Sequence, residues 1–391
     1  MRIGVDASSW FNGRGYGRFT RELLGALFAL PGEHEYQCFV DRRDAPRLAF
    51  ANGSVSVLGV ALGGRPAEEA KTGGSRSPLD LLRLTRAVAR ARPDVFFCPT
   101  VYSYFPLPPR LPSVVTVHDC IAERFPELTL PGRRDRLFWR LKVRLALAQA
   151  RRVLTVSDYS ARDLTAVLGV DPARVRVAVE APAAAFRPNP DRGAVAEAAA
   201  RHGLAPGTPY FVYAGGFSPH KGVVELVRAH GALAGAGGEP PHLVLVGDAE
   251  GDVFHGNAAE IREAVRAAGS GERVHWTGYV TDEELALLYA GALALVLVSR
   301  AEGFGLPAVE AAACGTPVVA TRESPLPELL EGAGLFLEPG DEAALGAALG
   351  RLAGDPDERR RMGRAARERA AALSWPRAAA AALAAIEEAA G

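Results

Sequence analysis

Short apolar runs alternate with helical patterns along the whole chain, and this alternation limits the fold more than any other feature. Such alternation is typical of parallel βαβ units. The sequence therefore predicts an α/β protein built from doubly wound parallel sheets in two halves. The expected strands are residues 2–6, 36–40, 55–59, 94–98, 113–118 and 152–156 in the first half, and 210–215, 243–247, 273–277, 293–298, 317–320 and 335–337 in the second.

The length supports two domains, because 391 residues exceed one ordinary hydrophobic core. A Pro- and Ala-rich stretch, 181–207, is interpreted as a linker with a short helix. We place an N-terminal domain at 1–185 and a C-terminal domain at 186–374. A last helix is expected to begin at Ser374-Trp375-Pro376, with Ser374 as its cap. The glycine-rich segment 65–77 is expected to be a surface loop.

The composition argues against several functions. Basic and acidic side chains balance at 45 each, so the bulk charge predicts no nucleic-acid partner. The apolar neighbours of Cys38, Cys98 and Cys314 predict buried thiols rather than disulfides or zinc ligands. No apolar run reaches the roughly 18 residues of a membrane span, and the chain enters an expected strand too early for a signal peptide. A cytoplasmic protein is expected.

The segment from Ala301 to Glu310 (Ala-Glu-Gly-Phe-Gly-Leu-Pro-Ala-Val-Glu) joins an expected buried strand to a short helical pattern. Pro307 fits the first helical position. A helix N-terminus has unpaired N–H groups and partial positive charge, which suits a phosphate. Glu302 in the loop and Glu310 in the helix can both face the crevice at the carboxyl ends of the strands. The alternative is an ordinary turn with two solvated glutamates.

Two further segments place polar residues after expected strands. In the second half, the strand from Tyr210 leads into a glycine-rich loop, and Lys221 opens the next helix. A lysine beside helix N–H groups is a cationic partner for a diphosphate, although it can also be a solvated residue at a helix start. In the first half, a β-branched strand from Ser113 ends in His118-Asp119. An isolated histidine is more often structural, but its place at a strand's carboxyl end favours a functional role.

These segments resemble the motifs of retaining glycosyltransferases with the GT-B fold, in particular glycosyltransferase family 4, whose E-x7-E motif matches Glu302 and Glu310. The resemblance implies two Rossmann-like domains facing across a cleft, with the C-terminal helix, 375–391, packing back on the first domain. It implies that Glu302 and the backbone after it hold the donor sugar, and that Glu310 holds the nucleotide ribose. His118 is expected to lie against the donor sugar.

The resemblance covers other donor contacts. Family members often carry an arginine near the matching lysine, but this chain has Gly216 and His220 at the two usual positions, which leaves Lys221 as the main fixed cation. A second departure is Glu180-Ala-Pro182, where many members carry Asn-Gly. The expected catalytic residues are His118, Glu302 and Lys221, and the expected donor-binding residues are Gly15, Tyr16, Gly17, Gly216, Lys221, Tyr279, Val280, Glu302, Phe304, Gly305, Leu306 and Glu310.

The implied activity is transfer of a hexose from a nucleoside-diphosphate sugar to a glycan, a lipid-linked or a small-molecule acceptor, with retention of configuration. Likenesses at Val117-His118-Asp119 and Gly247-Asp248 to mannosyltransferase-like members of bacterial polysaccharide pathways favour mannose. No Asp-x-Asp pair or His/Cys cluster stands where a metal would be needed, so no metal and no cofactor are expected. Helix termini and Lys221 would take the place of a divalent cation.

Other classes of function fit these motifs less well. A dinucleotide-dependent oxidoreductase should show G-x-G-x-x-G after a strand, but Gly15-Tyr-Gly17 is followed by Thr20 at the third position. A GT-B sugar-nucleotide epimerase and a non-catalytic nucleotide-sugar-binding protein remain alternatives. The E-x7-E loop together with Lys221 favours transfer over epimerisation. The presence of His118, Glu302 and Lys221 argues against a binding protein without activity.

The segment from Arg133 to Arg152 carries eight basic residues against one acid, Asp135. On a helical wheel its apolar side chains form one arc and its arginines a neighbouring arc. A basic amphipathic helix can lie on an anionic membrane and bring an enzyme to a lipid-linked acceptor. The alternative, which the sequence favours, is that the apolar arc packs on the first domain's sheet. The apolar arc consists of Leu137, Phe138, Leu141, Leu145 and Ala148.

Overall fold

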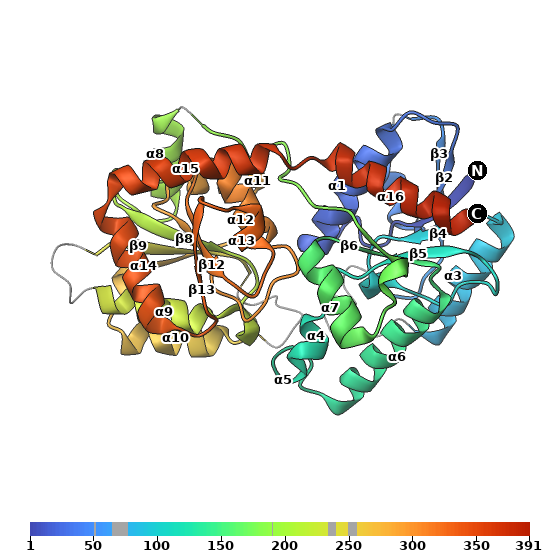
Figure 1. Cartoon of the computed structure of the whole chain (residues 1–391), viewed down its shortest axis with the longest axis horizontal. Coiled ribbons are helices and arrows are strands. Elements are labelled where there is room, and N and C mark those ends of the chain that lie inside the picture. The colour runs from blue at the N-terminus through green and yellow to red at the C-terminus, as the bar shows by residue number, and fades with distance from the viewer. Residues whose placement is uncertain (51, 65–76, 190, 234–239, 249–255) are drawn as a thin grey trace. The chain divides into compact units, whose positions relative to one another are not determined.

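The computed structural model describes the whole chain except residues 51, 65–76, 190, 234–239 and 249–255 (Figure 1). The loop expected at 65–77 therefore lies outside the described residues, apart from Ser77. The chain forms two compact units. Unit 1 consists of residues 1–126, 130–180 and 374–391, and unit 2 of residues 127–129 and 181–373.

Unit 1 contains a seven-stranded parallel sheet with strand order β3-β2-β1-β4-β5-β6-β7. The order reverses between β1 and β4, and the crevice at such a switch point is where open α/β sheets bind ligands. The three-residue strand β7 was not anticipated, since it is short and has an arginine at its centre. The strands are β1 (Arg2–Asp6), β2 (Glu35–Asp41), β3 (Val55–Val60), β4 (Val95–Cys98), β5 (Ser113–Thr116), β6 (Arg152–Thr155) and β7 (Val175–Val177).

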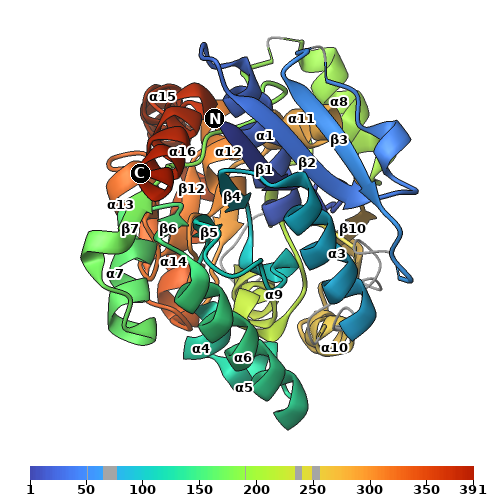
Figure 2. The same ribbon diagram turned by 90° about the vertical axis from the view of Figure 1, so that its right-hand side faces the viewer.

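Helices cover this sheet, and the chain's last helix is one of them (Figure 2). That helix, α16, packs against α1 and strands β4 to β7. The Ser374 hydroxyl accepts the N–H of Arg377, which confirms the expected cap. The helices of unit 1 are α1 (Gly15–Ala29), α3 (Pro78–Ala91), α4 (Ile121–Arg124), α6 (Arg133–Gln149), α7 (Asp158–Leu168) and α16 (Trp375–Ala390). Most of the short helix α5 (Pro126–Thr129) belongs to unit 2.

Unit 2 contains a six-stranded parallel sheet with strand order β10-β9-β8-β11-β12-β13, so its switch point lies between β8 and β11. Its strands are β8 (Tyr210–Ala214), β9 (His242–Val246), β10 (Val274–Gly278), β11 (Leu295–Leu297), β12 (Val318–Thr321) and β13 (Gly334–Leu337). Its helices are α8 (Arg192–Arg201), α9 (Val223–Ala232), α10 (Ala258–Ala267), α11 (Asp282–Gly291), α12 (Leu306–Ala313), α13 (Leu326–Leu329), α14 (Glu342–Gly354) and α15 (Pro356–Ala371). The predicted α/β class with two parallel sheets is confirmed.

Cys38, Cys98 and Cys314 are buried free thiols, as predicted, and Cys120 is also a buried free thiol. The prediction for α6 is wrong, because its apolar arc does not pack on the sheet. Leu137, Phe138, Leu141 and Leu145 are 67%, 58%, 52% and 43% exposed. The buried face of α6 is instead the opposite one, which carries Val143 and Ala146. Within the described part of the chain, no helix is long and apolar enough to cross a membrane.

Candidate active site

The carboxyl end of β8 leads into a glycine-rich loop and the 3-10 turn η5 (Pro219–Lys221). Lys221 ends this turn and lies just before α9, rather than opening that helix as expected. Gly222 between them has φ of 69°, and a Cβ there would lie 2.4 Å from the Val298 carbonyl oxygen. Only glycine combines this left-handed conformation with so close an approach. The loop is therefore seated directly against the segment that follows β11.

The segment after β11 carries the E-x7-E motif. Helix α12 begins at Leu306, one residue before the expected start, with Gly305 at its cap in a left-handed conformation (φ 84°). Glu302 and Glu310 are 8% and 3% exposed, so the alternative of two solvated glutamates does not hold. The Glu302 N–H donates to the Glu323 carbonyl at 2.9 Å. This bond ties the Glu302 backbone to the chain that follows β12.

Lys221 and Glu302 form an ion pair across the switch point of unit 2. The Lys221 Nζ lies 2.7 Å from Glu302 Oε1, and the Ser299 hydroxyl donates to the same oxygen at 2.5 Å. The Arg300 N–H donates to the His220 carbonyl at 2.7 Å, which holds the two loops together. Both side chains are largely buried, so the pair has a fixed geometry. The structure thus brings together two of the three residues expected to be catalytic.

His220 supplies no second cation in this loop. Its side chain is buried, and burial, together with the nearby Lys221 charge, lowers the pKa of His220 to about 3. The imidazole is therefore neutral at physiological pH. Gly216 has no side chain, so Lys221 is the charged residue of the loop from Gly215 to Gly222. A diphosphate placed there would meet one side-chain cation and the backbone N–H groups around it.

The neutral state of His220 predicts a pH dependence of stability. The unfolded chain binds a proton near the ordinary pKa of about 6.5, while the folded chain does not until about pH 3. Stability therefore falls as the pH drops below about 6.5. Between pH 7.5 and pH 5.0, the unfolding free energy of the wild type should fall by about 2 kcal/mol more than that of the His220→Gln variant, as measured by urea titration. An equal loss in both proteins would contradict the buried neutral histidine.

His118, the third expected catalytic residue, lies in unit 1 after β5. Its Nδ1 is 3.7 Å from Glu180 Oε1, and its Nε2 is 3.2 Å from the Pro99 carbonyl oxygen. The ring packs edge-on against Phe19 at a centroid distance of 4.7 Å. Burial raises the pKa of Glu180, and the contact with His118 acts in the opposite direction. The imidazole is therefore held in one orientation by groups of unit 1 alone.

Glu180 and Ser160 were not anticipated as partners of His118. Glu180 stood out only as a departure from the family's Asn-Gly pair. The N-cap of α7 is Ser157, whose hydroxyl accepts the Ser160 N–H at 3.0 Å. The Ser160 hydroxyl donates to the His118 carbonyl at 2.8 Å. Such long-range pairings leave no trace in local sequence.

The expected donor-binding residues Gly15, Tyr16 and Gly17 form the first turn of α1. A Cβ on Gly17 would lie 2.1 Å from the Asn12 carbonyl oxygen, so this glycine permits a close backbone crossing. Tyr16 stacks on Tyr102 at 5.0 Å, and Tyr102 contacts Trp139 at 5.0 Å. Sequence reasoning missed this aromatic row, because its members come from three separate segments.

The remaining expected donor residues lie in unit 2. The side chains of Val280, Phe304 and Leu306 are buried, which leaves their backbone groups as the atoms able to meet a ligand. Tyr279 follows β10 with a side chain that is 74% exposed. The described residues contain no cluster of three or more His, Cys, Asp or Glu side chains placed to hold a metal ion.

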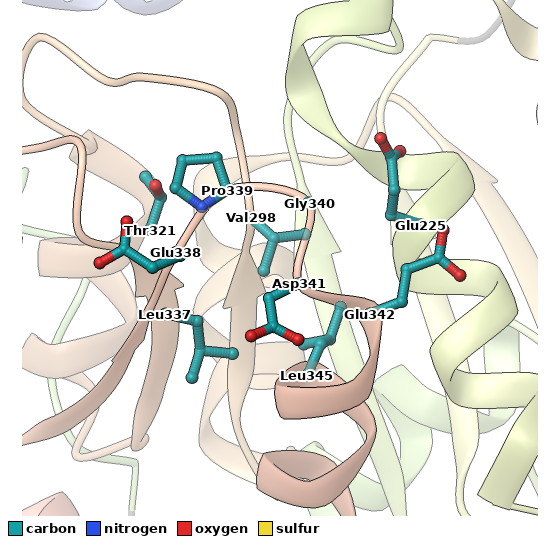
Figure 3. A pocket seen from close by; sticks show the side chains of 10 residues that line it. All are labelled: Glu225, Val298, Thr321, Leu337, Glu338, Pro339, Gly340, Asp341, Glu342 and Leu345. Atoms are coloured by element: carbon teal, nitrogen blue, oxygen red, sulfur yellow. The ribbon is translucent and has the colours of Figure 1, made fainter.

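A small cavity at the carboxyl ends of β11, β12 and β13 does not suit a diphosphate (Figure 3). Its walls include the acidic residues Glu225, Glu338, Asp341 and Glu342. Glu225 is paired with Arg300 at 2.7 Å, and Asp341 caps α14. The carboxylates would repel a phosphate. The Lys221–Glu302 pair is therefore the better candidate for the reacting site.

Two doubly wound parallel sheets, with a glycine-rich loop and an E-x7-E loop at the switch point of the second, define a protein of the GT-B class. Residues 195–369 match the family model for glycosyl transferases group 1. Residues 13–178 match the model for glycosyltransferase family 4. The chain belongs to this family of group 1 glycosyltransferases, which confirms the resemblance drawn from its motifs.

Curated relatives agree with this assignment, and a solved structure shares the fold. The D-inositol 3-phosphate glycosyltransferase of Nocardia farcinica is 35% identical over 272 residues, 68% of this chain and 59% of the relative. The O-antigen chain mannosyltransferase B of Escherichia coli is 31% identical over 246 residues, 62% of each chain. The chain thus spans less than two thirds of either relative. Anabaena HepE in complex with UDP-glucose has the same fold, with a TM-score of 0.73 and 18% identity over 99% of both chains.

Proposed function

We propose that this protein is a retaining glycosyltransferase of the cytoplasm that moves a hexose from a nucleoside-diphosphate sugar to a glycan, a lipid-linked or a small-molecule acceptor. The buried Lys221–Glu302 pair at the switch point of unit 2 carries this proposal. The departing diphosphate gains negative charge as the glycosidic bond breaks. A cation and N–H groups already fixed in place stabilise that charge without reorganising.

Glu302 has a second role in this proposal, because it holds Lys221 before the donor binds. Ordering a lysine side chain costs conformational entropy. The ion pair with Glu302 already orders Lys221 in the free enzyme, so donor binding does not have to. The Ser299 hydroxyl shares the same carboxylate oxygen and fixes its direction. The other Glu302 oxygen then remains for a sugar hydroxyl. The proposed reaction needs no metal ion, since Lys221 and the starts of α9 and α12 take its place.

The other proposed roles follow the burial pattern. Glu310, in α12, accepts hydrogen bonds from the ribose hydroxyls. Backbone groups of Phe304, Gly305 and Leu306 contact the donor sugar. Backbone groups at Tyr279 and Val280 lie beside the base. In unit 1, His118 is proposed to contact the sugar, and the turn Gly15-Tyr16-Gly17 to meet the diphosphate.

Mannose from GDP-mannose is the proposed donor group. The name of the Escherichia coli relative supports mannose, and the UDP-glucose complex of HepE supports a nucleotide sugar as the class of donor. An epimerase would instead interconvert nucleotide sugars without an acceptor. A binding protein without activity would hold the donor and leave it intact.

A panel of nucleotide sugars tests this proposal. We expect one of them to stabilise the protein by about 2.7 kcal/mol at one hundred times its Kd, measured as a rise in melting temperature. The same compound should release its nucleoside diphosphate with turnover, and an excess of EDTA should leave the rate unchanged. A rate abolished by EDTA and restored by Mn²⁺ or Mg²⁺ would contradict the metal-free site. Conversion to an epimeric nucleotide sugar, or binding without turnover, would favour one of the alternatives.

A further inference from the structure

Exposed apolar side chains gather on one helix of unit 1. Among the described residues, eight large hydrophobic side chains are exposed, and four of these belong to α6. Three of the four are leucines spaced four residues apart, which places them in one row along the helix. Phe138 lies beside this row. A concentration of this kind marks an interaction surface, since scattered exposed hydrophobic residues are ordinary but contiguous ones are not.

Arginines border the apolar row along one side. Helical spacing puts Arg133, Arg140 and Arg144 on this flank and Arg134 within the apolar arc at the start of the helix, and all four are exposed. Within the described residues, no hydrogen bond or ion pair holds Arg133, Arg134 or Arg144. Arg136 differs, because its guanidinium donates to the Leu130 and Pro131 carbonyls and so belongs to the local structure.

The inner face of α6 is fixed, so the outer face cannot turn toward the core. Val143 and Ala146 are buried against the unit. The Trp139 indole N–H donates to Glu123 at 2.7 Å. The Gln149 side chain exchanges hydrogen bonds with the backbone of Leu107, at 3.0 Å and 3.1 Å. The contacts of these inner residues leave the leucine row pointing away from the sheet.

We propose that the outer face of α6, formed by Arg133, Arg134, Leu137, Phe138, Arg140, Leu141, Arg144 and Leu145, binds the surface of an anionic lipid bilayer. In this arrangement the leucines and Phe138 enter the boundary between headgroups and acyl chains, while the arginines reach lipid phosphates. The helix has 17 residues and lies flat over roughly 25 Å of the surface.

Charge complementarity favours a bilayer over a second copy of the chain. Two copies joined through this face in a symmetric dimer would bring their arginine flanks toward each other, and the outer face carries no acid to offset them. An anionic surface offers many phosphates to the same arginines. Resting on the proposed transferase function, this surface further implies that the acceptor is a lipid-linked molecule.

Co-sedimentation with vesicles tests the proposal. The wild-type protein should bind vesicles of phosphatidylcholine containing about one third phosphatidylglycerol, and should bind pure phosphatidylcholine far more weakly. Raising the salt from about 0.1 M to about 1 M shortens the screening length from roughly 10 Å to 3 Å and should release the protein. Absence of binding to anionic vesicles at low salt would overturn the proposal, as would equal binding to neutral vesicles.

Two variants separate the contributions of charge and apolar side chains. Arg133→Glu/Arg144→Glu should lower the partition coefficient onto anionic vesicles by about 25-fold or more, since each basic residue raises that coefficient roughly five-fold. Leu137→Gln/Leu141→Gln keeps the charge and should weaken it by about ten-fold or more. All four positions are exposed, so circular dichroism should show an unchanged fold.

The matched control is Arg364→Glu/Arg367→Glu on α15, which makes the same change in net charge at exposed positions of unit 2. It should bind as the wild type does, and an equal loss in the control would show a nonspecific charge effect and overturn the proposal. Concentration-dependent self-association abolished by Leu137→Gln/Leu141→Gln, without vesicle binding, would assign the face to a second copy. Stabilisation by nucleotide sugars is measured without lipid, so failure of the proposed transferase function is seen separately.

Discussion

Lys221→Ala is expected to lower the turnover of the donor by about 10²- to 10³-fold, the scale for losing one preorganised group that stabilises developing charge. The lysine is the charged side chain of its loop, because His220 is neutral and Gly216 has no side chain. No other residue of that loop can replace its charge on the leaving diphosphate. The measurement is the rate of nucleoside-diphosphate release at saturating donor.

The structure adds a complication to this variant, because Glu302 loses its partner when Lys221 is removed. Removing one partner of a buried ion pair costs about 3–5 kcal/mol, so instability contributes to the loss in activity. The double variant Lys221→Ala/Glu302→Gln removes the charge of both residues and separates the two effects. Recovery of stability without recovery of turnover assigns the loss to catalysis.

A surface cation on the helix that follows Lys221 provides the control. Arg228 in α9 is exposed and pairs with Glu342 at 3.3 Å. An exposed pair of this kind contributes about 0–1 kcal/mol to stability, so Arg228→Ala should leave both stability and turnover near the wild-type values. If Lys221→Ala also stays within a few-fold of the wild type, the lysine is a structural partner of Glu302 and nothing more.

The strands and the position of the candidate site could be predicted from sequence because both have local causes. Strands β8 and β11 are buried along their whole length and appear as continuous apolar runs. Lys221 and Glu302 both follow such runs. In a parallel sheet the carboxyl ends of neighbouring strands meet at one edge, so their proximity follows from strand order.

Other features could not be predicted, because they depend on which distant segments meet. Glu180 and His118 are 62 positions apart (180 − 118) and touch only after the sheet of unit 1 has formed. Helix α6 has two faces able to pack, one with large leucines and one with Val143 and Ala146. The periodicity of apolar residues predicts that the face with the large leucines packs against the core. The structure uses the other, because Trp139 and Gln149 find polar partners on that side.

Replacing each glutamate of the E-x7-E motif should impair a different step, sugar transfer for Glu302 and nucleoside-diphosphate binding for Glu310. Glu302→Ala should lower sugar transfer by about 10²-fold, since the proposed contact is to the sugar and its ion pair positions Lys221. Nucleoside-diphosphate affinity should be retained or raised in this variant, because Lys221 loses a competing anion. Glu310→Ala should instead weaken nucleoside-diphosphate binding by about ten-fold or more, because a buried ribose would lose a charged acceptor.

Calorimetric titration with the nucleoside diphosphate and single-turnover transfer from the nucleotide sugar measure the two effects separately. Glu331→Ala is the control, since this glutamate is exposed and pairs with Arg369 at the surface, at 2.9 Å. Glu331→Ala should change neither the nucleoside-diphosphate affinity nor the rate of sugar transfer, as expected for an exposed pair. An equal loss of nucleoside-diphosphate affinity in Glu302→Ala and Glu310→Ala would contradict the proposed division of roles. Both residues would then act on the nucleotide, and the sugar would be held by other groups.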